Sequence, residues 1–216
     1  MQQRSTKTLY SYWNEIRGAR STPERRDIDP TRIRDALAHT FILESIDGIE
    51  FSFRLAGSHI CATYCRELKT RPFSSLWALG DHDALETLMR AVTEDHAVAL
   101  VTFEGQTERG EKLGFEMALF PLRHNGVTTT RMLGGLTALD APYWLGIHPI
   151  IDQRITGLRL IWPDDRDTMT PEGYRKAMTD DIAAVVNDTH TPLPSTVSGF
   201  SARRYAHLAV IDGGKA

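Results

Sequence analysis

The chain has 216 residues, 41% of them hydrophobic and 25% charged, and a formal net charge of -3. This length suits one full domain with appended segments, and the charge argues against a nucleic-acid-binding protein that works by neutralising phosphates. No apolar run is long enough to span a bilayer, and the N-terminus lacks the apolar core of a secretion signal. We therefore expect a cytoplasmic protein that binds neither nucleic acid nor a membrane.

The first element is an amphipathic helix, which the spacing of large apolar side chains predicts over residues 6–17. Its stripe consists of Leu9, Tyr12, Trp13 and Ile16. Such a helix either packs on its own domain or pairs with another subunit, and in the second case the stripe is an interaction surface. A second helix is predicted from Pro30 to His39, because Asp29 supplies an N-cap and proline suits the first turn.

The pattern then changes to the two-residue period of strands. Residues 41–46 and 51–56 flank the turn dipeptide Asp47-Gly48, which predicts a β-hairpin. A short helix follows, and Ser58 is placed to cap it.

A longer helix with one apolar face is predicted over residues 83–96, capped by Asp81. Three strands follow, at residues 98–103, 113–119 and 132–139. They are separated by turns centred on Arg109-Gly110 and Asn125-Gly126. In the last strand, Gly134-Gly135 predicts a close approach of another segment to the backbone or a bulge.

The order of these elements predicts an α+β domain at residues 40–145. Before it lie the N-terminal amphipathic helices (1–39), and after it come a C-terminal strand, a helix and a flexible tail (146–216). Within that last region, residues 158–162 alternate like an extra strand or a docking segment. Residues 172–187 carry the apolar spacing of a helix whose face must pack against its own domain, a second subunit or a partner.

Several motifs in this order resemble the PAS superfamily. They are Phe53-Arg54-Leu55-Ala56-Gly57, Tyr64 to Phe73 (YCRELKTRPF), Arg71 to Trp77 (RPFSSLW), Pro121-Leu122-Arg123-His124 and Ala141 to Gly146 (APYWLG). The closest resemblance is to uncharacterised stand-alone PAS proteins of alphaproteobacteria. It implies the PAS fold, a five-stranded antiparallel sheet with short helices on one face, here with flanking N- and C-terminal helices. PAS domains bind haem, flavins, small carboxylates or nothing, and often act through dimer partners.

The resemblance also implies a cavity between the sheet and the helices. Side chains predicted to face it are Phe53, Leu55, Tyr64, Trp77, Leu88, Met89, Phe115 and Met117. These residue types are also what a protein core needs, so the alternative is that they fill the interior and leave no cavity.

The sequence offers little support for a bound flavin, haem or metal ion. The cysteine of light-sensing PAS domains follows the Gly-Arg turn, whereas Cys65 precedes the corresponding turn here. His82 and His96 bracket the long helix and are the candidate haem ligands, although histidines beside helix ends are more often exposed. His59, Cys61 and Cys65 neither converge nor gain a fourth ligand, so we expect two free packing cysteines and no metal. The cofactor is left open, and none is expected.

The motifs of nucleophile-elbow hydrolases, phosphate-binding loops and zinc proteases are absent from the sequence. We therefore expect a non-enzymatic sensory or regulatory protein that acts in bacterial signalling through protein–protein interaction, as a homodimer with an unidentified signalling partner. The alternative is a PAS sensor that binds a small ligand or haem. A third option is a small α+β enzyme whose pocket pairs Glu116 with a histidine.

Overall fold

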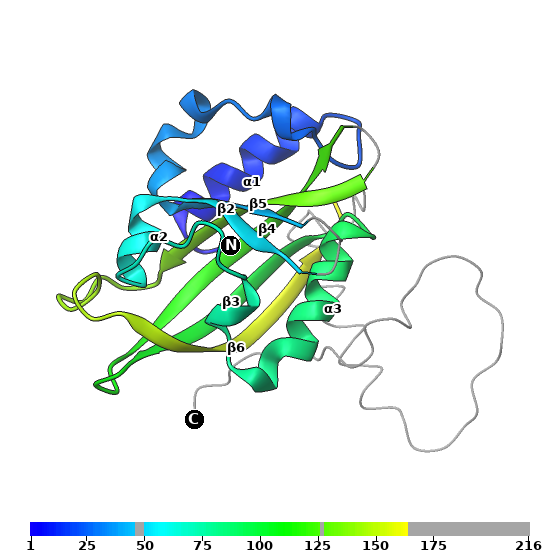
Figure 1. Ribbon diagram of the computed structural model, residues 1–216. Coiled ribbons are helices and arrows are strands. Elements are labelled where there is room, and N and C mark those ends of the chain that lie inside the picture. The colour runs from blue at the N-terminus through cyan, green and yellow to red at the C-terminus, as the bar shows by residue number, and fades with distance from the viewer. Residues whose placement is uncertain (46–49, 126–127, 164–216) are drawn as a thin grey trace, which may run out of the picture.

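The computed structural model describes residues 1–45, 50–125 and 128–163. These residues form a six-stranded sheet with the strand order β2-β1-β5-β4-β3-β6, in which neighbouring strands are antiparallel (Figure 1). The strands are β1 (Thr40–Glu44), β2 (Ser52–Ala56), β3 (Val98–Thr107), β4 (Lys112–His124), β5 (Thr128–Ala138) and β6 (Ile150–Ile161).

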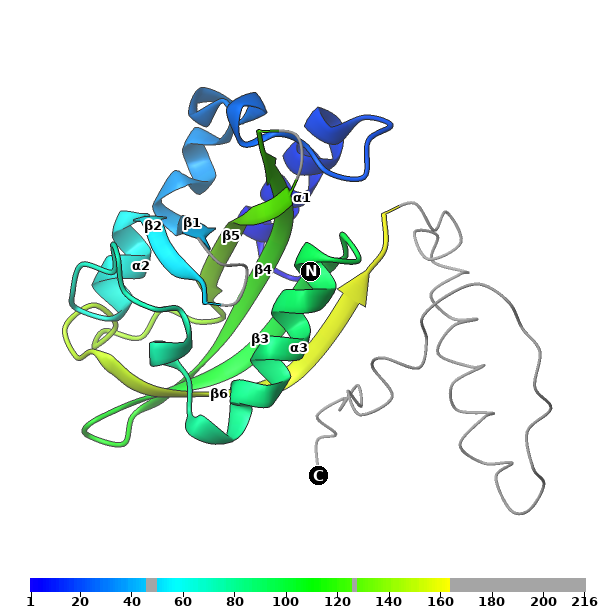
Figure 2. The same ribbon diagram turned by 45° about the vertical axis from the view of Figure 1, so that its right-hand side comes forward.

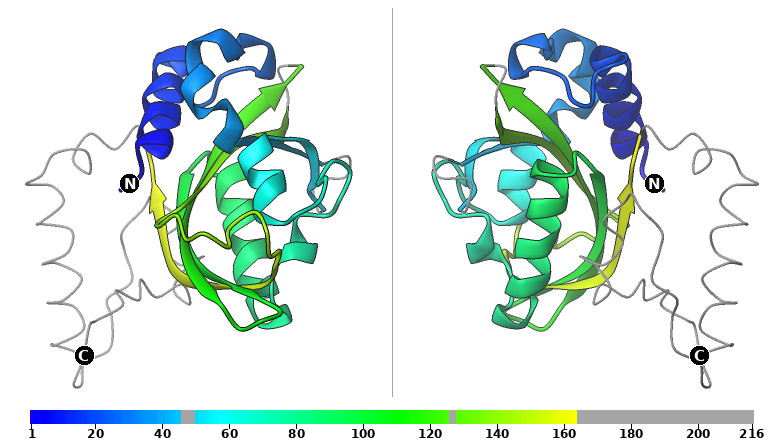
Figure 3. Two further views of the ribbon diagram at one scale, coloured as in Figure 1. Left: turned by 90° about the vertical axis from the view of Figure 1, so that its left-hand side faces the viewer. Right: turned by 90° about the vertical axis from the view of Figure 1, so that its right-hand side faces the viewer.

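Helices cover both faces of this sheet. The α-helices are α1 (Arg4–Arg17), α2 (Ser58–Thr63) and α3 (His82–Thr93), and 3-10 segments lie at Arg25–Asp27, Pro30–His39, Ser74–Leu76 and Leu79–Asp81. Figure 3 shows α1 on one side of the sheet and α2 and α3 on the other. In the described part of the chain, no helix is both long and apolar enough to cross a membrane.

The sheet has one strand more than the five we predicted. The sixth, β6, pairs with β3 along its whole length and includes residues 158–161 of the segment 158–162 that was predicted as an extra strand or docking segment. The sheet therefore continues past residue 145, where the sequence placed the end of the domain. The predicted helix at 172–187 lies outside the described residues.

The apolar stripe of α1 packs against the sheet of its own chain. Leu9 and Trp13 are fully buried and Tyr12 nearly so, while Ile16 is partly buried against the same cluster. The polar ends of the aromatic rings are also satisfied. Trp13 Nε1 donates a hydrogen bond to the carbonyl oxygen of Pro121 (2.9 Å), and the Tyr12 hydroxyl accepts one from the backbone N–H of Asp29 (2.6 Å). This stripe therefore has a partner surface within the domain.

The glycine pair in β5 marks close approaches on both faces, as its position in a strand predicted. A Cβ at Gly134 would overlap the ring of Phe41, which belongs to the core on the α3 side. A Cβ at Gly135 would lie 2.5 Å from Leu9 of α1. Glycine at both positions lets a large side chain rest directly on the sheet backbone.

The strand pairs predicted from the two hairpins and from the turn at Arg109-Gly110 are present, whereas the predicted helix caps are only partly correct. Asp29 accepts a hydrogen bond from Thr31 N, as an N-cap should, although the segment it begins is a kinked 3-10 helix. Ser58 is the first residue of α2 rather than its cap, which is Gly57. Asp81 is the N-cap residue of α3, as predicted, but its side chain makes no capping bond, because its carboxylate accepts the N–H of Ile155 in β6 (2.8 Å). That bond ties the start of α3 to the added strand.

Candidate functional site

The space between the sheet and α3 is filled by the chain's own side chains. Of the eight residues predicted to line a cavity there, all but Leu55 belong to one continuous buried cluster. Helix α3 lies directly on the sheet, in contact with β3, β4 and β5 (Figure 2). These seven side chains are buried, and one of them, Met89, also lines a hollow beside α3.

Leu55 is not part of this cluster, because a bulge in the edge strand β2 turns it to the other face. Phe53 pairs with Leu43, whose side chain is in the interior, whereas Leu55 pairs with Ile42, whose side chain belongs to the core on the α1 side. The extra residue between these pairs shifts the alternation by one position. As a result Leu55 is 46% exposed.

Aromatic rings form a continuous row through the interior. The row runs Phe41, Phe53, Phe73, Trp77, Phe103 and Phe115. The rings of Phe103 and Phe115 stack with their centroids 5.0 Å apart. A flavin or haem placed between sheet and helices would have to displace this row, so the interior does not fit either group.

Polar groups within the interior are few, and one of them has no partner. The Tyr64 hydroxyl donates to Oε1 of Gln153 in β6 (2.7 Å), and burial raises the pKa of Tyr64 far above its usual range. The indole Nε1 of Trp77 is buried with no hydrogen-bond partner in the described part of the chain. An unpaired buried donor of this kind costs about 1–3 kcal/mol unless a water or ligand satisfies it.

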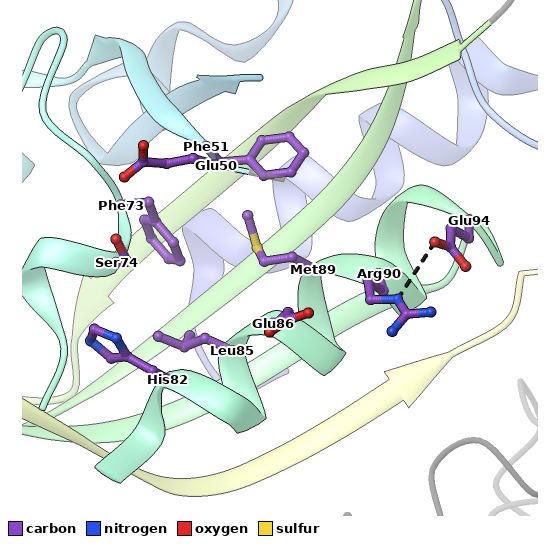
Figure 4. Close-up of a pocket in the computed structure, with 10 residues that line it drawn as sticks. All are labelled: Glu50, Phe51, Phe73, Ser74, His82, Leu85, Glu86, Met89, Arg90 and Glu94. Atoms are coloured by element: carbon purple, nitrogen blue, oxygen red, sulfur yellow. Dashed lines mark ion pairs between the residues drawn. The ribbon is translucent and has the colours of Figure 1, made fainter. Parts of the chain in front are cut away.

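A surface cleft of about 650 Å³ runs along α3, and its floor is the edge of the buried cluster. We call it the α3 cleft. Its walls come from the residues just before β2, from the start of the Ser74–Leu76 segment and from one side of α3 (Figure 4). The lining residues are Glu50, Phe51, Phe73, Ser74, His82, Leu85, Glu86, Met89, Arg90 and Glu94.

The α3 cleft has an apolar floor and a charged rim. Phe51, Phe73, Leu85 and Met89 are buried, and only Met89 was among the residues predicted to line a cavity. The rim carries the carboxylates Glu50, Glu86 and Glu94 and one guanidinium, Arg90, which pairs with Glu94 at 3.5 Å. With three acidic groups and one basic group, the rim is net negative when His82 is neutral.

The two candidate haem ligands lie at opposite ends of α3. Nε2 of His82 is 3.3 Å from the carbonyl oxygen of Trp77 and lines the α3 cleft. His96 follows the helix with a positive φ of 56° and does not line the cleft. One helix therefore cannot aim both imidazoles at the same site.

The cysteines stand apart from the interior. Cys61 Sγ contacts the carbonyl oxygen of Ala56 and the carboxylate of Glu67, each at 3.8 Å, and Cys65 is exposed. Burial raises the pKa of the Cys61 thiol. Neither thiol belongs to the buried cluster beneath α3, so neither is placed to react with a group bound there.

His59 instead meets a residue that sequence spacing does not connect to it. Its Nδ1 lies 3.1 Å from Nε2 of His39, with the two rings perpendicular. Burial, and then the nearby His59, lower the pKa of His39, while a hydrogen bond to the Leu136 carbonyl opposes that shift. The pair borders a hollow of about 220 Å³. No motif in the sequence predicts this pair, because the two histidines are 20 residues apart and belong to different helical segments.

Glu116, the carboxylate of the enzyme option, is engaged by backbone groups. It is 1% exposed and accepts hydrogen bonds from the N–H groups of Gln2 (2.6 Å) and Gln3 (3.0 Å) at the start of α1. Its described hydrogen bonds include none to a histidine. This carboxylate holds the first helix on the sheet, which is a structural role.

The chain is similar to one protein family model and to several solved structures. No curated protein matches the chain. Among solved structures, a light-oxygen-voltage domain studied with a flavin analogue is 14% identical, with a TM-score of 0.42 over 52% of this chain and 85% of its own. A PAS domain of a protein from Colwellia psychrerythraea is 15% identical, with a TM-score of 0.39 over 51% of this chain and 98% of its own.

A variant of RsLOV is 10% identical, with a TM-score of 0.40 over 86% of this chain and 85% of its own. A family model described as "PAS domain" matches residues 1–137, which is more than half of the chain. The matched residues include α1, which packs on one face of the sheet, together with strands β1 to β4 and most of β5. The chain therefore belongs to the PAS domain family, whose fold is that of signalling sensors.

Proposed function

We propose that this protein is a non-enzymatic PAS regulator of bacterial signalling that binds a segment of another protein in the α3 cleft. The observation that carries the proposal is the position of the hollow space. The chain's own rings pack the interior, whereas a concavity of about 650 Å³ with an apolar floor opens between α3 and residues 50–51 and 73–74. An apolar groove along a helix suits a peptide segment with projecting side chains.

The chemistry of the α3 cleft indicates what such a segment contains. Its apolar floor favours one or two large hydrophobic side chains, which anchor most peptide interfaces. The acidic rim favours lysine or arginine beside those anchors, since Arg90 already pairs with Glu94 while Glu86 stands exposed on the same helix. The partner segment is therefore expected to be both apolar and basic.

A displayed random-peptide library tests this directly. Peptides selected on the full chain are expected to combine large apolar residues with lysine or arginine, and to bind less tightly as salt rises. In fluorescence polarisation, Glu86→Lys is expected to weaken such a peptide about tenfold or more, because it replaces an attraction by a repulsion at the rim.

The matched control is Glu108→Lys, which reverses the same charge at an exposed position in the turn between β3 and β4. It is expected to leave peptide binding within about twofold of the wild type, as distant surface charges are screened. A library that yields no binders, or binders indifferent to Glu86→Lys, would overturn the proposed site.

We also propose that two copies of the chain associate. Apolar side chains that are exposed in one chain gather just before and at the start of β6: Tyr143 (84%), Ile147 (66%) and Ile151 (55%). The outer edge of β6 pairs with no described strand, and two such edges can pair around a twofold axis. Light scattering should give the mass of two chains, and of one chain for the double variant Ile147→Lys with Ile151→Lys. A monomeric wild type would refute this.

A small-molecule sensor is the second candidate function, and two observations favour it. The α3 cleft lies within the range of about 300–1,000 Å³ that is common for ligand pockets. Beside its residues Phe73 and His82, the indole N–H of Trp77 lacks a partner among the described residues. Native mass spectrometry would detect a retained ligand, and a Soret or flavin band would identify haem or flavin. Colourless protein with the mass of the bare chain would remove this candidate.

A further inference from the structure

We propose that His39 and His59 form a two-histidine site for a divalent transition-metal ion such as Zn²⁺, Cu²⁺ or Ni²⁺. The site lies where α2 meets the Pro30–His39 segment, away from the α3 cleft. It is independent of the regulatory function proposed above. The argument rests on the geometry of the two rings, on what holds them in place and on the hollow they border.

The separation of the two nitrogens matches a pair of ligands on one ion. His59 Nδ1 and His39 Nε2 are 3.1 Å apart. Two imidazole nitrogens, each about 2.1 Å from an ion and separated by an angle of about 90–110°, lie about 3.0–3.4 Å from each other. The same distance is that of a hydrogen bond between the two rings. An ion takes the place of the shared hydrogen, with a small rotation of the rings, when the ring hydrogen of neutral His59 moves to Nε2.

The backbone fixes this separation through Gly57. Its N–H donates to the carbonyl oxygen of Thr40 (2.8 Å), the residue after His39. A Cβ at Gly57 would lie 2.5 Å from the carbonyl oxygen of Ala38, the residue before His39. The start of α2 is thus pressed against the end of the preceding 3-10 segment, which is what brings the two imidazoles together. Thr63 adds a hydrogen bond to the carbonyl oxygen of His59 (2.9 Å).

The surroundings of His39 favour the form that binds metals. A metal ligand must be a neutral imidazole, and its second ring nitrogen usually donates to a carbonyl or carboxylate that fixes the ring. For His39 the backbone of Leu136 in β5, which also lines the hollow, is placed to act as such a partner. When the ring hydrogen of His39 lies on the nitrogen that faces Leu136, the nitrogen that faces His59 carries a lone pair.

The adjoining hollow leaves room for the remaining ligands of the ion. It measures about 220 Å³, and apart from the two histidines its walls are small or apolar side chains such as Ala62 and Leu145, with one hydroxyl from Thr63. The described residues contain no group of three or more His, Cys, Asp or Glu that could hold a metal. Water or an external ligand must therefore complete the coordination. Two imidazoles without a carboxylate select Zn²⁺, Cu²⁺ or Ni²⁺ over Mg²⁺ and Ca²⁺.

Calorimetric titration of the full, tag-free chain with ZnCl₂ and NiCl₂ tests the site. We expect one ion per chain, and a loss of affinity of about tenfold or more in both His39→Gln and His59→Gln. The control His124→Gln removes a partly exposed histidine at the far end of β4 and is expected to bind as the wild type does. MgCl₂ should give no binding.

Electron paramagnetic resonance of the wild-type chain with Cu²⁺ tests the site without relying on a folded variant. The wild type should show hyperfine coupling to two imidazole nitrogens, and circular dichroism will show whether each variant is folded. Absence of stoichiometric binding in the wild type would overturn the proposal. So would binding that persists when both histidines are replaced, because it would reveal an adventitious ion only.

Discussion

Replacing Glu116 by alanine is expected to lower the free energy of unfolding by about 2–4 kcal/mol. The buried carboxylate accepts two backbone N–H groups at the start of α1, where the helix has no side-chain cap of its own. A negative charge at the N-terminus of a helix also interacts favourably with the helix dipole. Alanine removes both effects and leaves two amide donors without this acceptor beside a void.

Urea unfolding of the full chain measures this loss, and Glu104→Ala is the matched control. Glu104 lies on the neighbouring strand β3 and pairs with Lys112 at 2.6 Å, but its side chain is 44% exposed. Its replacement is expected to cost less than about 1 kcal/mol, because exposed ion pairs contribute little. Glu116→Gln should fall between the two, since the amide oxygen is a neutral acceptor. Equal losses for Glu116→Ala and Glu104→Ala would contradict the capping role.

The sequence could not reveal the role of Glu116, because both faces of β4 are covered. Along this strand Phe115 and Met117 face α3, whereas Ala118 and Phe120 face α1. In the sequence, a glutamate that alternates with apolar residues resembles the solvent side of a half-buried strand. Only the placement of α1 over that side converts it into a buried cap. The face that a terminal helix covers depends on contacts between residues far apart in the sequence, here residues 2–3 and 116.

Local signals, by contrast, predicted most of the sheet correctly. Each predicted hairpin joins strands that are adjacent in sequence, and turn dipeptides such as Arg109-Gly110 set the connection through a few backbone angles; Gly110 has the positive φ (82°) that favours glycine. The added strand β6 follows a long connection from β5 and pairs with β3. Such a pairing requires that β3 has an unpaired edge. The alternation of residues 158–162 predicts a strand but does not show which strand it pairs with.

The candidate site was harder to predict, because the periodicity of apolar residues predicts which side chains are buried but not where a cavity lies between them. The spacing that assigned Phe115 and Met117 to the inner face was correct, yet the same spacing occurs whether a helix stands off from the sheet or lies on it. Here the aromatic row lets α3 lie close to the sheet, and the concavity lies beside the helix, between α3 and residues 50–51 and 73–74. Leu55 shows the second limit, since one bulged residue reverses the face of the side chains that follow.

Replacing Gly57 by alanine is expected to cost about 3 kcal/mol or more, or to prevent folding altogether. The backbone angles of this residue (φ -69°, ψ 160°) are open to alanine, so the requirement is one of space. The atoms that a Cβ would meet are the carbonyl groups of Leu37 and Ala38, which cannot rotate away as a side chain can. Either the Pro30–His39 segment shifts, or the hydrogen bond from Gly57 to Thr40 breaks.

The matched control for this substitution is Gly80→Ala, whose added Cβ would meet nothing within 4 Å. Thermal and urea unfolding should place it within about 0.5 kcal/mol of the wild type. If Gly57→Ala folds, it should also bind Zn²⁺ or Ni²⁺ more weakly than Gly80→Ala, because separating α2 from the preceding segment draws His59 away from His39. A folded Gly57→Ala with the stability and metal affinity of the wild type would show that the contact between these two segments is looser than the geometry demands. Since one glycine sets both quantities, their joint loss would identify the contact between α2 and the Pro30–His39 segment as the element that positions the histidine pair.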